Sequence, residues 1–148
     1  MDENKALWKK CVEFHGHECG GLTIGYKASL YAIELLKLEL GGGGNAGCLS
    51  ADEEIVCISE NDAIQVMMGC SVGTGNLLFH MRGKQAFTFF DRKNGKSLRL
   101  VLKPKPEGMT RQESFAYYQS CAPEDMFRVM EAKLHLPEAA RIFDSYPC

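Results

Sequence analysis

Residues 85–103 read Gln-Ala-Phe-Thr-Phe-Phe-Asp-Arg-Lys-Asn-Gly-Lys-Ser-Leu-Arg-Leu-Val-Leu-Lys, and this stretch decides the fold class of the chain. Two segments of strand-forming composition, 85–91 and 97–103, flank the pair Asn94-Gly95. An Asn-Gly pair in this setting is typical of a tight β-hairpin, since both residues accept the positive φ angles that such turns require. We therefore expect two antiparallel strands joined by a short turn.

Upstream of this hairpin, the hydrophobic spacing predicts three helices and two further strands. The helices are expected at 3–14, from about Gly21 to Gly41, and from Asn61 or Asp62 to about Met68, and the strands at 54–59 and 77–81. A run of four glycines from Gly41 ends the long helix and opens a loop that reaches about Asp52.

Downstream of the hairpin, two more helices are expected. Thr110 and Glu113 have capping-box spacing, which predicts a helix over 111–121. Pro123 suits the first position of a second helix that reaches about His135. The resulting order, α-α-β-α-β-β-β-α-α, predicts an α+β architecture with an antiparallel portion. We expect a single domain over 1–148, with a core at about 8–103 and a helical extension at about 108–148.

Size, composition and charge exclude several classes of protein. The chain has 148 residues, of which 45% are hydrophobic and 24% charged, as in an ordinary globular domain. A net charge of -2 gives no basic face for nucleic acid. No apolar run approaches the roughly 20 residues that span a bilayer, and the charged N-terminus lacks the apolar core of a signal peptide. We expect no nucleic-acid partner, no membrane partner and a cytoplasmic location.

The cysteines also favour a reducing compartment. There are seven, an odd number, scattered through the chain without any Cys-x-x-Cys pair. This pattern is unlike a disulfide scaffold or a structural zinc knuckle. We expect reduced thiols, some buried as small hydrophobic residues and some reactive or metal-bound.

The strongest candidate site is the segment Phe14-His15-Gly16-His17-Glu18-Cys19-Gly20-Gly21. Imidazole and thiolate groups are ligands suited to zinc, nickel or copper. In an extended or irregular segment, residues two apart project the same way, so His15, His17 and Cys19 are expected to converge. The alternative explanation is a polar turn whose histidines are merely solvated.

Cys19 leaves two kinds of chemistry open. It stands at the start of the long helix, where unpaired backbone N–H groups and the helix dipole stabilise an anion. The same thiolate serves as a metal ligand or, with His15 as its base, as a nucleophile. One hypothesis is therefore a transition-metal site, with zinc or nickel as the expected ion. The other is a metal-free thiol or redox protein in which Cys19 is the reactive group.

A second loop, 69–76, contributes another thiol. Cys70 lies there among glycine, hydroxyl and amide residues. Taken alone, this loop has the composition of a tight structural turn. Beside the His/Cys segment, Cys70 becomes a fourth candidate metal ligand after His17, Cys19 and His15.

In a set of ordered motifs, the chain resembles the FmdE family of formylmethanofuran dehydrogenase components. The motifs are Phe-His-Gly-His-x-Cys-x-Gly-Leu-x-Ile-Gly-Tyr over 14–26, Glu60-Asn61-Asp62-Ala63, Ile64-Gln65, Gly69-Cys70, Gly73-Thr74-Gly75-Asn76-Leu77 and the stretch 83–90. The resemblance implies an α-β-α-β-β-β core with a mixed four-stranded sheet and helices on its faces. It also implies a metal-binding protein, namely an accessory subunit or a small metalloenzyme related to formylmethanofuran dehydrogenase.

This chain departs from the family pattern at two places near the site. Family members usually have Pro where Gly20 stands. They commonly carry a Cys-x-x-Asp insert where Ala63 here runs directly into Ile64. Some members end in a Cys-rich zinc finger, which we do not expect here because no paired cysteines follow Lys103.

An excess of apolar residues after Lys103 predicts a homodimer. The two helices expected there carry Phe115, Tyr117, Tyr118, Met126, Phe127, Val129, Met130, Leu134 and Leu136. This is more than one sheet face needs, and aromatic and Met side chains are typical of interface cores. We expect these helices to pack across a two-fold axis and to help wall the metal site. A larger oxidoreductase complex is the other partner that the resemblance suggests.

Overall fold

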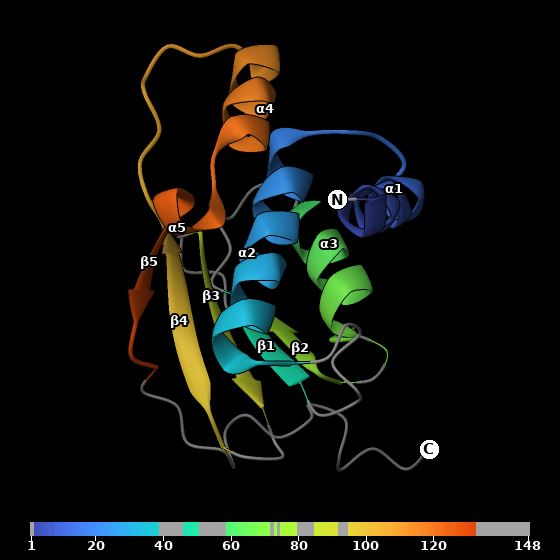
Figure 1. Cartoon of the computed structure of the whole chain (residues 1–148), viewed down its shortest axis with the longest axis vertical. Helices are drawn as coiled ribbons and strands as arrows, with labels where there is room; N and C mark the ends of the chain where they lie inside the picture. Colours follow the sequence, from blue (N-terminus) through green and yellow to red (C-terminus); the bar gives the residue numbers. More distant parts are fainter. Residues whose placement is uncertain are drawn as a thin grey trace.

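The computed structural model describes residues 2–38, 46–50, 59–71, 73, 75–79, 85–91 and 95–132. Its elements, in chain order, are α1 (Asp2–His15), α2 (Gly20–Leu36), β1 (Ala46–Ser50), α3 (Ser59–Met68), β2 (Leu77–Phe79), β3 (Ala86–Asp91), β4 (Ser97–Leu102), α4 (Arg111–Ser120), α5 (Pro123–Met126) and β5 (Phe127–Met130). Figure 1 shows α2 lying along the sheet, with α3 and α1 beside it. The predicted α+β class is confirmed.

The predicted hairpin is present as β3 and β4. These strands pair antiparallel, from Ala86 opposite Val101 to Phe90 opposite Ser97. Gly95 has φ +74°, the left-handed conformation for which an Asn-Gly turn is suited. Strand β3 is the middle one of the sheet, and every one of its residues is buried.

The sheet has five strands in the order β2-β1-β3-β4-β5, not the four that the resemblance implies. Strands β1 and β2 are parallel, and the other neighbouring pairs are antiparallel. The additional strand lies in the segment from Pro123 to about His135, for which the prediction of a single helix is wrong. Its described part forms the four-residue helix α5 and then β5, whose Phe127 and Val129 lie opposite Leu102 and Leu100. Backbone pairing with the edge of β4 outweighs local helix propensity, and residues 133–148 lie outside the described part.

Two predictions upstream of the hairpin are also corrected. Residues 46–50 were expected in a loop but form β1, because β2 and β3 pair with its backbone on both sides. The long helix ends at Leu36 rather than at Gly41. Lys37 caps this end: it takes a left-handed conformation (φ 54°) and donates its N–H to the Ile33 carbonyl. The strand expected at 54–59 lies outside the described residues except for Ser59, which begins α3.

Helices α2 and α3 cross at very short range, and two glycines permit it. A Cβ at Gly25 would stand 1.9 Å from the Glu60 carbonyl oxygen, and one at Gly21 would stand 2.9 Å from the Ser59 Cβ. Since no larger residue fits at position 25, the backbone of α3 rests directly on α2. This contact brings the first turn of α3 next to the His/Cys segment.

Helix α4 is tied to α2 by polar contacts at its C-terminal end. The Lys27 ammonium donates to the carbonyls of Gln119, at 2.8 Å, and Cys121. The Gln119 side chain donates in turn to Thr23 Oγ1 at 2.9 Å. At the other end, Thr110 caps the helix by accepting from the Glu113 N–H, as its capping-box spacing predicts. In the part of the chain described, none of the helices is both long and apolar enough to cross a membrane.

Candidate functional site

The His/Cys segment joins α1 to α2 through a sharp turn. His15 is the last residue of α1, and Gly16 follows with φ +101°, a conformation that favours glycine. Cys19 is extended (φ -155°, ψ 167°) and is the N-cap of α2, where its Sγ accepts from the Leu22 N–H at 3.4 Å. A helix end and a turn, rather than one extended strand, therefore aim these side chains at a common point.

The structure brings three of the four candidate ligands together. One ligand atom each from His15, His17 and Cys19 lies within 4.8 Å of the other two. His15 Nε2 and Cys19 Sγ are 3.6 Å apart, and the two imidazole centroids are 4.5 Å apart. We call these three residues the His/Cys cluster. Two imidazoles and a thiol at this range form a donor set for one metal ion.

Asp62 contacts the cluster from α3 and is absent from the residues that the sequence proposes as ligands or catalytic groups. Its Oδ2 lies 2.6 Å from His15 Nδ1, and Gln65 Nε2 donates to its Oδ1 at 3.3 Å. The His15 side chain is 7% exposed, whereas that of Asp62 is 34% exposed, so a half-buried carboxylate holds one ring nitrogen of a buried imidazole. A proton held at Nδ1 leaves the Nε2 lone pair directed toward Cys19.

Cys70 does not join the His/Cys cluster. It is fully buried in the hydrophobic core, and its thiol lies 3.8 Å from the Met68 carbonyl oxygen. Gly69 before it has φ +66° and ends α3. This thiol therefore contributes to the packing of the hydrophobic core.

Cys11, in the C-terminal half of α1, differs from Cys19 in its surroundings. Cys11 is fully buried in α1, and this burial raises the pKa of its thiol to about 11. The Cys11 thiol is therefore neutral at physiological pH, whereas Cys19 lies at a helix N-terminus and is partly exposed.

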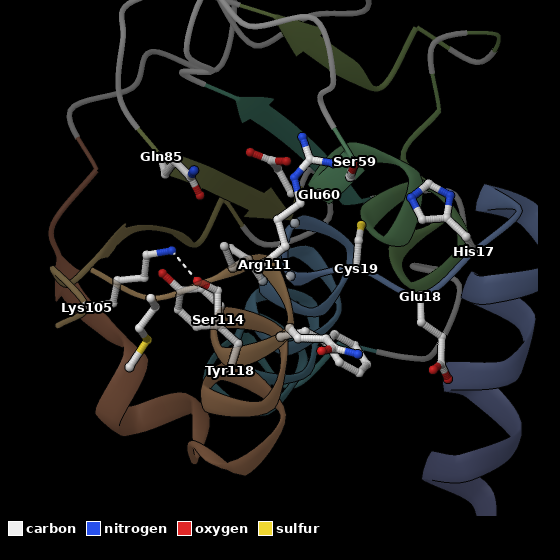
Figure 2. A pocket seen from close by; sticks show the side chains of 16 residues that line it. His17, Glu18, Cys19, Ser59, Glu60, Gln85, Lys105, Arg111, Ser114 and Tyr118 are labelled. Carbon is white, nitrogen blue, oxygen red and sulfur yellow. Dashed lines mark hydrogen bonds between the residues drawn. The ribbon is translucent and has the colours of Figure 1, made fainter. Parts of the chain in front are cut away.

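A cavity of about 650 Å³ opens beside the cluster (Figure 2), within the size range of sites for small organic molecules. His17 and Cys19 line one part of it, and side chains from the chain after β4 line another. Its lining includes Ser59, Glu60, Gln85, Lys105, Arg111, Ser114 and Tyr118 among polar residues and Ile24, Met109 and Phe115 among apolar ones. The sequence holds no signal for this grouping, since it depends on α4 folding back over α2.

Aromatic side chains line the cavity or contact residues that line it. Trp8 donates its indole N–H to Glu18 at 3.2 Å and packs edge-on to Tyr26 at a centroid separation of 5.3 Å. Burial raises the pKa of Tyr118, so this phenol is protonated and uncharged at neutral pH. Tyr118 therefore gives the cavity a neutral phenol, while the Trp8 N–H is engaged with Glu18.

A family model matches the larger part of this chain. The model of the family described as "FmdE, Molybdenum formylmethanofuran dehydrogenase operon" matches residues 14–138. A solved structure, that of a tungsten formylmethanofuran dehydrogenase FmdE-like protein from Syntrophus aciditrophicus, is 22% identical with a TM-score of 0.63. This match covers 89% of the present chain and 73% of that one, and it shows a likeness of fold.

A curated relative is similar over part of the chain. It is the "Probable S-adenosyl-L-methionine-binding protein" of Archaeoglobus fulgidus, which is 34% identical over 101 residues. The aligned region covers 65% of this chain and 26% of the relative, so the match spans about a quarter of that protein's length.

Proposed function

This chain belongs to the FmdE family, and from that premise we propose that it is a protein that binds one transition-metal ion through His15, His17 and Cys19. The observation that carries the proposal is the convergence of three donor atoms within 4.8 Å. Zinc and nickel are the ions proposed, because mixed imidazole and thiolate donors suit both.

The spacing of the donors fits a tetrahedral site. With zinc–sulfur and zinc–nitrogen bonds of about 2.3 and 2.05 Å, a sulfur and a nitrogen ligand stand about 3.6 Å apart in a regular tetrahedron. The separation of Cys19 Sγ and His15 Nε2 is 3.6 Å. These two atoms therefore need no rearrangement to share an ion.

Asp62 would act as a positioning residue for this site. Histidines that bind metals commonly donate their second ring N–H to a carboxylate, which fixes the ring and makes the free nitrogen a better ligand. The His15–Asp62 contact has this arrangement, and Gln65 holds the carboxylate in turn. The chain thus supplies both a ligand and its support.

Three protein ligands leave a fourth coordination position for water or substrate, which is the arrangement of catalytic rather than structural zinc sites. A bound ion would supply Lewis-acid chemistry there. The protein's own part is to place Cys19 at the N-terminus of α2 and to present the cluster to the cavity that His17 and Cys19 line. We propose on this basis a small metalloenzyme or an accessory subunit related to formylmethanofuran dehydrogenase.

Metal analysis of protein purified without an affinity tag tests the proposal. We expect close to one ion per chain in the native protein and almost none in a His17→Ala, Cys19→Ala double variant. Cys121→Ser is the matched control, because this free cysteine is also partly exposed but lies outside the His/Cys cluster. Equal metal content in native protein and double variant would rule the site out.

A second candidate function rests on the chain of contacts Asp62–His15–Cys19. A carboxylate, an imidazole and a thiol in this order form the arrangement that activates a cysteine nucleophile without metal. The two functions differ in how Cys19 responds to a chelator. If the thiol acts alone, Cys19 is alkylated by iodoacetamide at the same rate with and without chelator. If the ion is present, chelator accelerates the labelling.

We extend the proposal to assembly and location. The homodimer and the association with a larger oxidoreductase remain predictions, and Val129 and Met130 on the edge strand β5 provide exposed apolar surface for a subunit contact. None of the cysteines that the structure describes with their side chains, namely Cys11, Cys19, Cys70 and Cys121, forms a disulfide. Free thiols support the proposed cytoplasmic location.

A further inference from the structure

We propose that the cavity beside the His/Cys cluster binds an elongated organic anion, with its acidic group held by Lys105 and Arg111 and its other end at Cys19 and His17. Its role as substrate rests on the proposed function. Its binding does not, because Lys105 and Arg111 lie outside the cluster.

Two cations in the cavity wall are available to a ligand. Within the described part of the chain, neither Lys105 nor Arg111 makes an ion pair with a carboxylate. Lys105 donates to Ser114 Oγ at 2.5 Å and lies 5.9 Å from the centroid of the Tyr118 ring, and neither of these partners is a carboxylate. An anionic group on a ligand would neutralise these charges, with the guanidinium offering a bidentate contact.

The start of α4 reinforces this preference. Arg111 is the first residue of a ten-residue helix, and Gln112 and Ser114 from the same first turns also line the cavity. The positive end of the helix dipole therefore lies at the cavity wall. The carboxylates of Glu18 and Glu60 also line the cavity, so the lining as a whole carries both signs of charge. The side-chain donors of Lys105 and Arg111 and the direction of α4 favour an anion at their end of the cavity.

A buried acceptor adds a second requirement for the ligand. Gln85 Oε1 is inaccessible to solvent and has no hydrogen-bond partner in the structure, yet Gln85 lines the cavity. A buried acceptor without a partner is unfavourable. A hydroxyl or amine group on the ligand would satisfy this oxygen, so the anion is expected to carry a hydrogen-bond donor as well.

The arrangement of these groups gives the ligand its direction. Figure 2 shows Lys105 and Gln85 at one end of the cavity, His17 and Cys19 at the other, and Arg111 between them. Ile24, Met109 and Phe115 provide apolar wall for the body of the molecule. A compact ion such as inorganic phosphate would reach only one end, whereas an organic anion spans both.

Two dyes that differ by one charged group test this proposal on the native, full-length chain. The anionic dye 8-anilinonaphthalene-1-sulfonate and N-phenyl-1-naphthylamine share an apolar body, but only the first carries a sulfonate. Both are titrated by fluorescence against protein treated with chelator. We expect the sulfonate to bind at least about tenfold more tightly, as one or two charge-assisted contacts provide.

Variants locate the binding. Arg111→Gln and Lys105→Met should each remove most of this preference, while the affinity for the neutral dye stays the same. Arg128→Gln is the matched control, because this arginine is exposed on β5 and does not line the cavity. Equal affinities of the native protein for the two dyes, or a preference that survives both variants, would overturn the proposal.

Protection of Cys19 provides a second measurement that requires no variant. Saturating sulfonate dye should slow the alkylation of Cys19 by iodoacetamide severalfold and leave that of Cys121 unchanged. Saturation without any protection of Cys19 would contradict the proposed orientation. Because the protein is free of metal in these assays, a failed metal analysis leaves the anion result standing, and a failed anion assay leaves the metal result standing.

Discussion

Asp62 Oδ2 lies 2.6 Å from His15 Nδ1, although 47 positions separate the two residues. The contact exists because α3 rests on α2 and presents its first turn to the segment that follows α1. The orientation of His15, a candidate metal ligand, thus depends on the packing of α2 against α3. The contact between His15 and Asp62 and the packing of the two helices can each be tested.

Asp62→Asn should weaken metal binding without removing it. The amide keeps the size of the side chain but loses the charge that fixes His15, and changes of this kind cost about 10- to 100-fold in affinity. Titration against a chromogenic zinc chelator measures the loss. Asp125→Asn, in the exposed first turn of α5, should keep the native affinity. An unchanged affinity in Asp62→Asn would show that His15 needs no support.

Gly25→Ala should destabilise the whole fold. The new methyl group would meet the Glu60 carbonyl oxygen at 1.9 Å, so α3 must move away from α2. We expect a loss of about 3 kcal/mol or more in the free energy of unfolding, at the upper end for overpacking, as measured by urea denaturation. Gly20→Ala is the matched control, since its methyl group would stand 3.6 Å from Tyr118, an ordinary contact. Equal stability of the two variants would contradict the close crossing.

Lys27→Met should loosen α4 from α2. The variant leaves the carbonyls of Gln119 and Cys121 without their donor, and we expect a cost of about 1–3 kcal/mol. Burial lowers the pKa of Lys27, so part of this cost is offset by the removal of a desolvated charge. Hydrogen exchange should become faster in α4 but not in β3. Lys9→Met, at a site on α1 with 79% side-chain exposure, should change neither.

Stability should fall between pH 9 and 11 because of Cys11. Its pKa is raised from 9.0 to about 11 in the folded chain, so the unfolded chain releases the thiol proton first as the pH rises. Folding stability is therefore full below pH 9 and declines toward pH 11, by up to about 3 kcal/mol. Urea denaturation at several pH values measures the slope. Cys11→Ala should flatten it and Cys121→Ala should not.

The homodimer is tested by sedimentation velocity at micromolar concentration. We expect a species of twice the 16.5 kDa chain mass. Val129→Lys should shift it toward the monomer, because this residue is 46% exposed on the edge strand β5. A native protein that sediments as a monomer while retaining its metal would exclude the predicted interface.

The sequence predicts those elements that depend on neighbouring residues. The turn at Gly95, the capping box at Thr110 and the break at Gly16 are local signals, and each is found where expected. Strands β1 and β5 were missed because partners far along the chain determine them: β1 pairs with β2 and β3, and β5 pairs with β4.

The residues of the candidate site also fall into those that are close in the sequence and those that folding brings together. His15, His17 and Cys19 lie within five residues, so their proximity is evident from the sequence. Asp62, Lys105 and Arg111 reach the site only through the packing of α3 and α4. Asp62 does lie in one of the motifs shared with the family, Glu60-Asn61-Asp62-Ala63, whereas no such motif includes Lys105 or Arg111. Cys70 was the converse case, since its motif resembles a site component but its side chain packs in the core.

The hydrogen bond from Trp8 to Glu18 has an optical consequence. Trp8 is the chain's single tryptophan, and its partner stands between His17 and Cys19 in the sequence. The tryptophan fluorescence of the whole protein therefore originates beside the candidate site. A ligand or ion that moves this segment changes the emission of one known indole, so binding can be followed in unlabelled native protein.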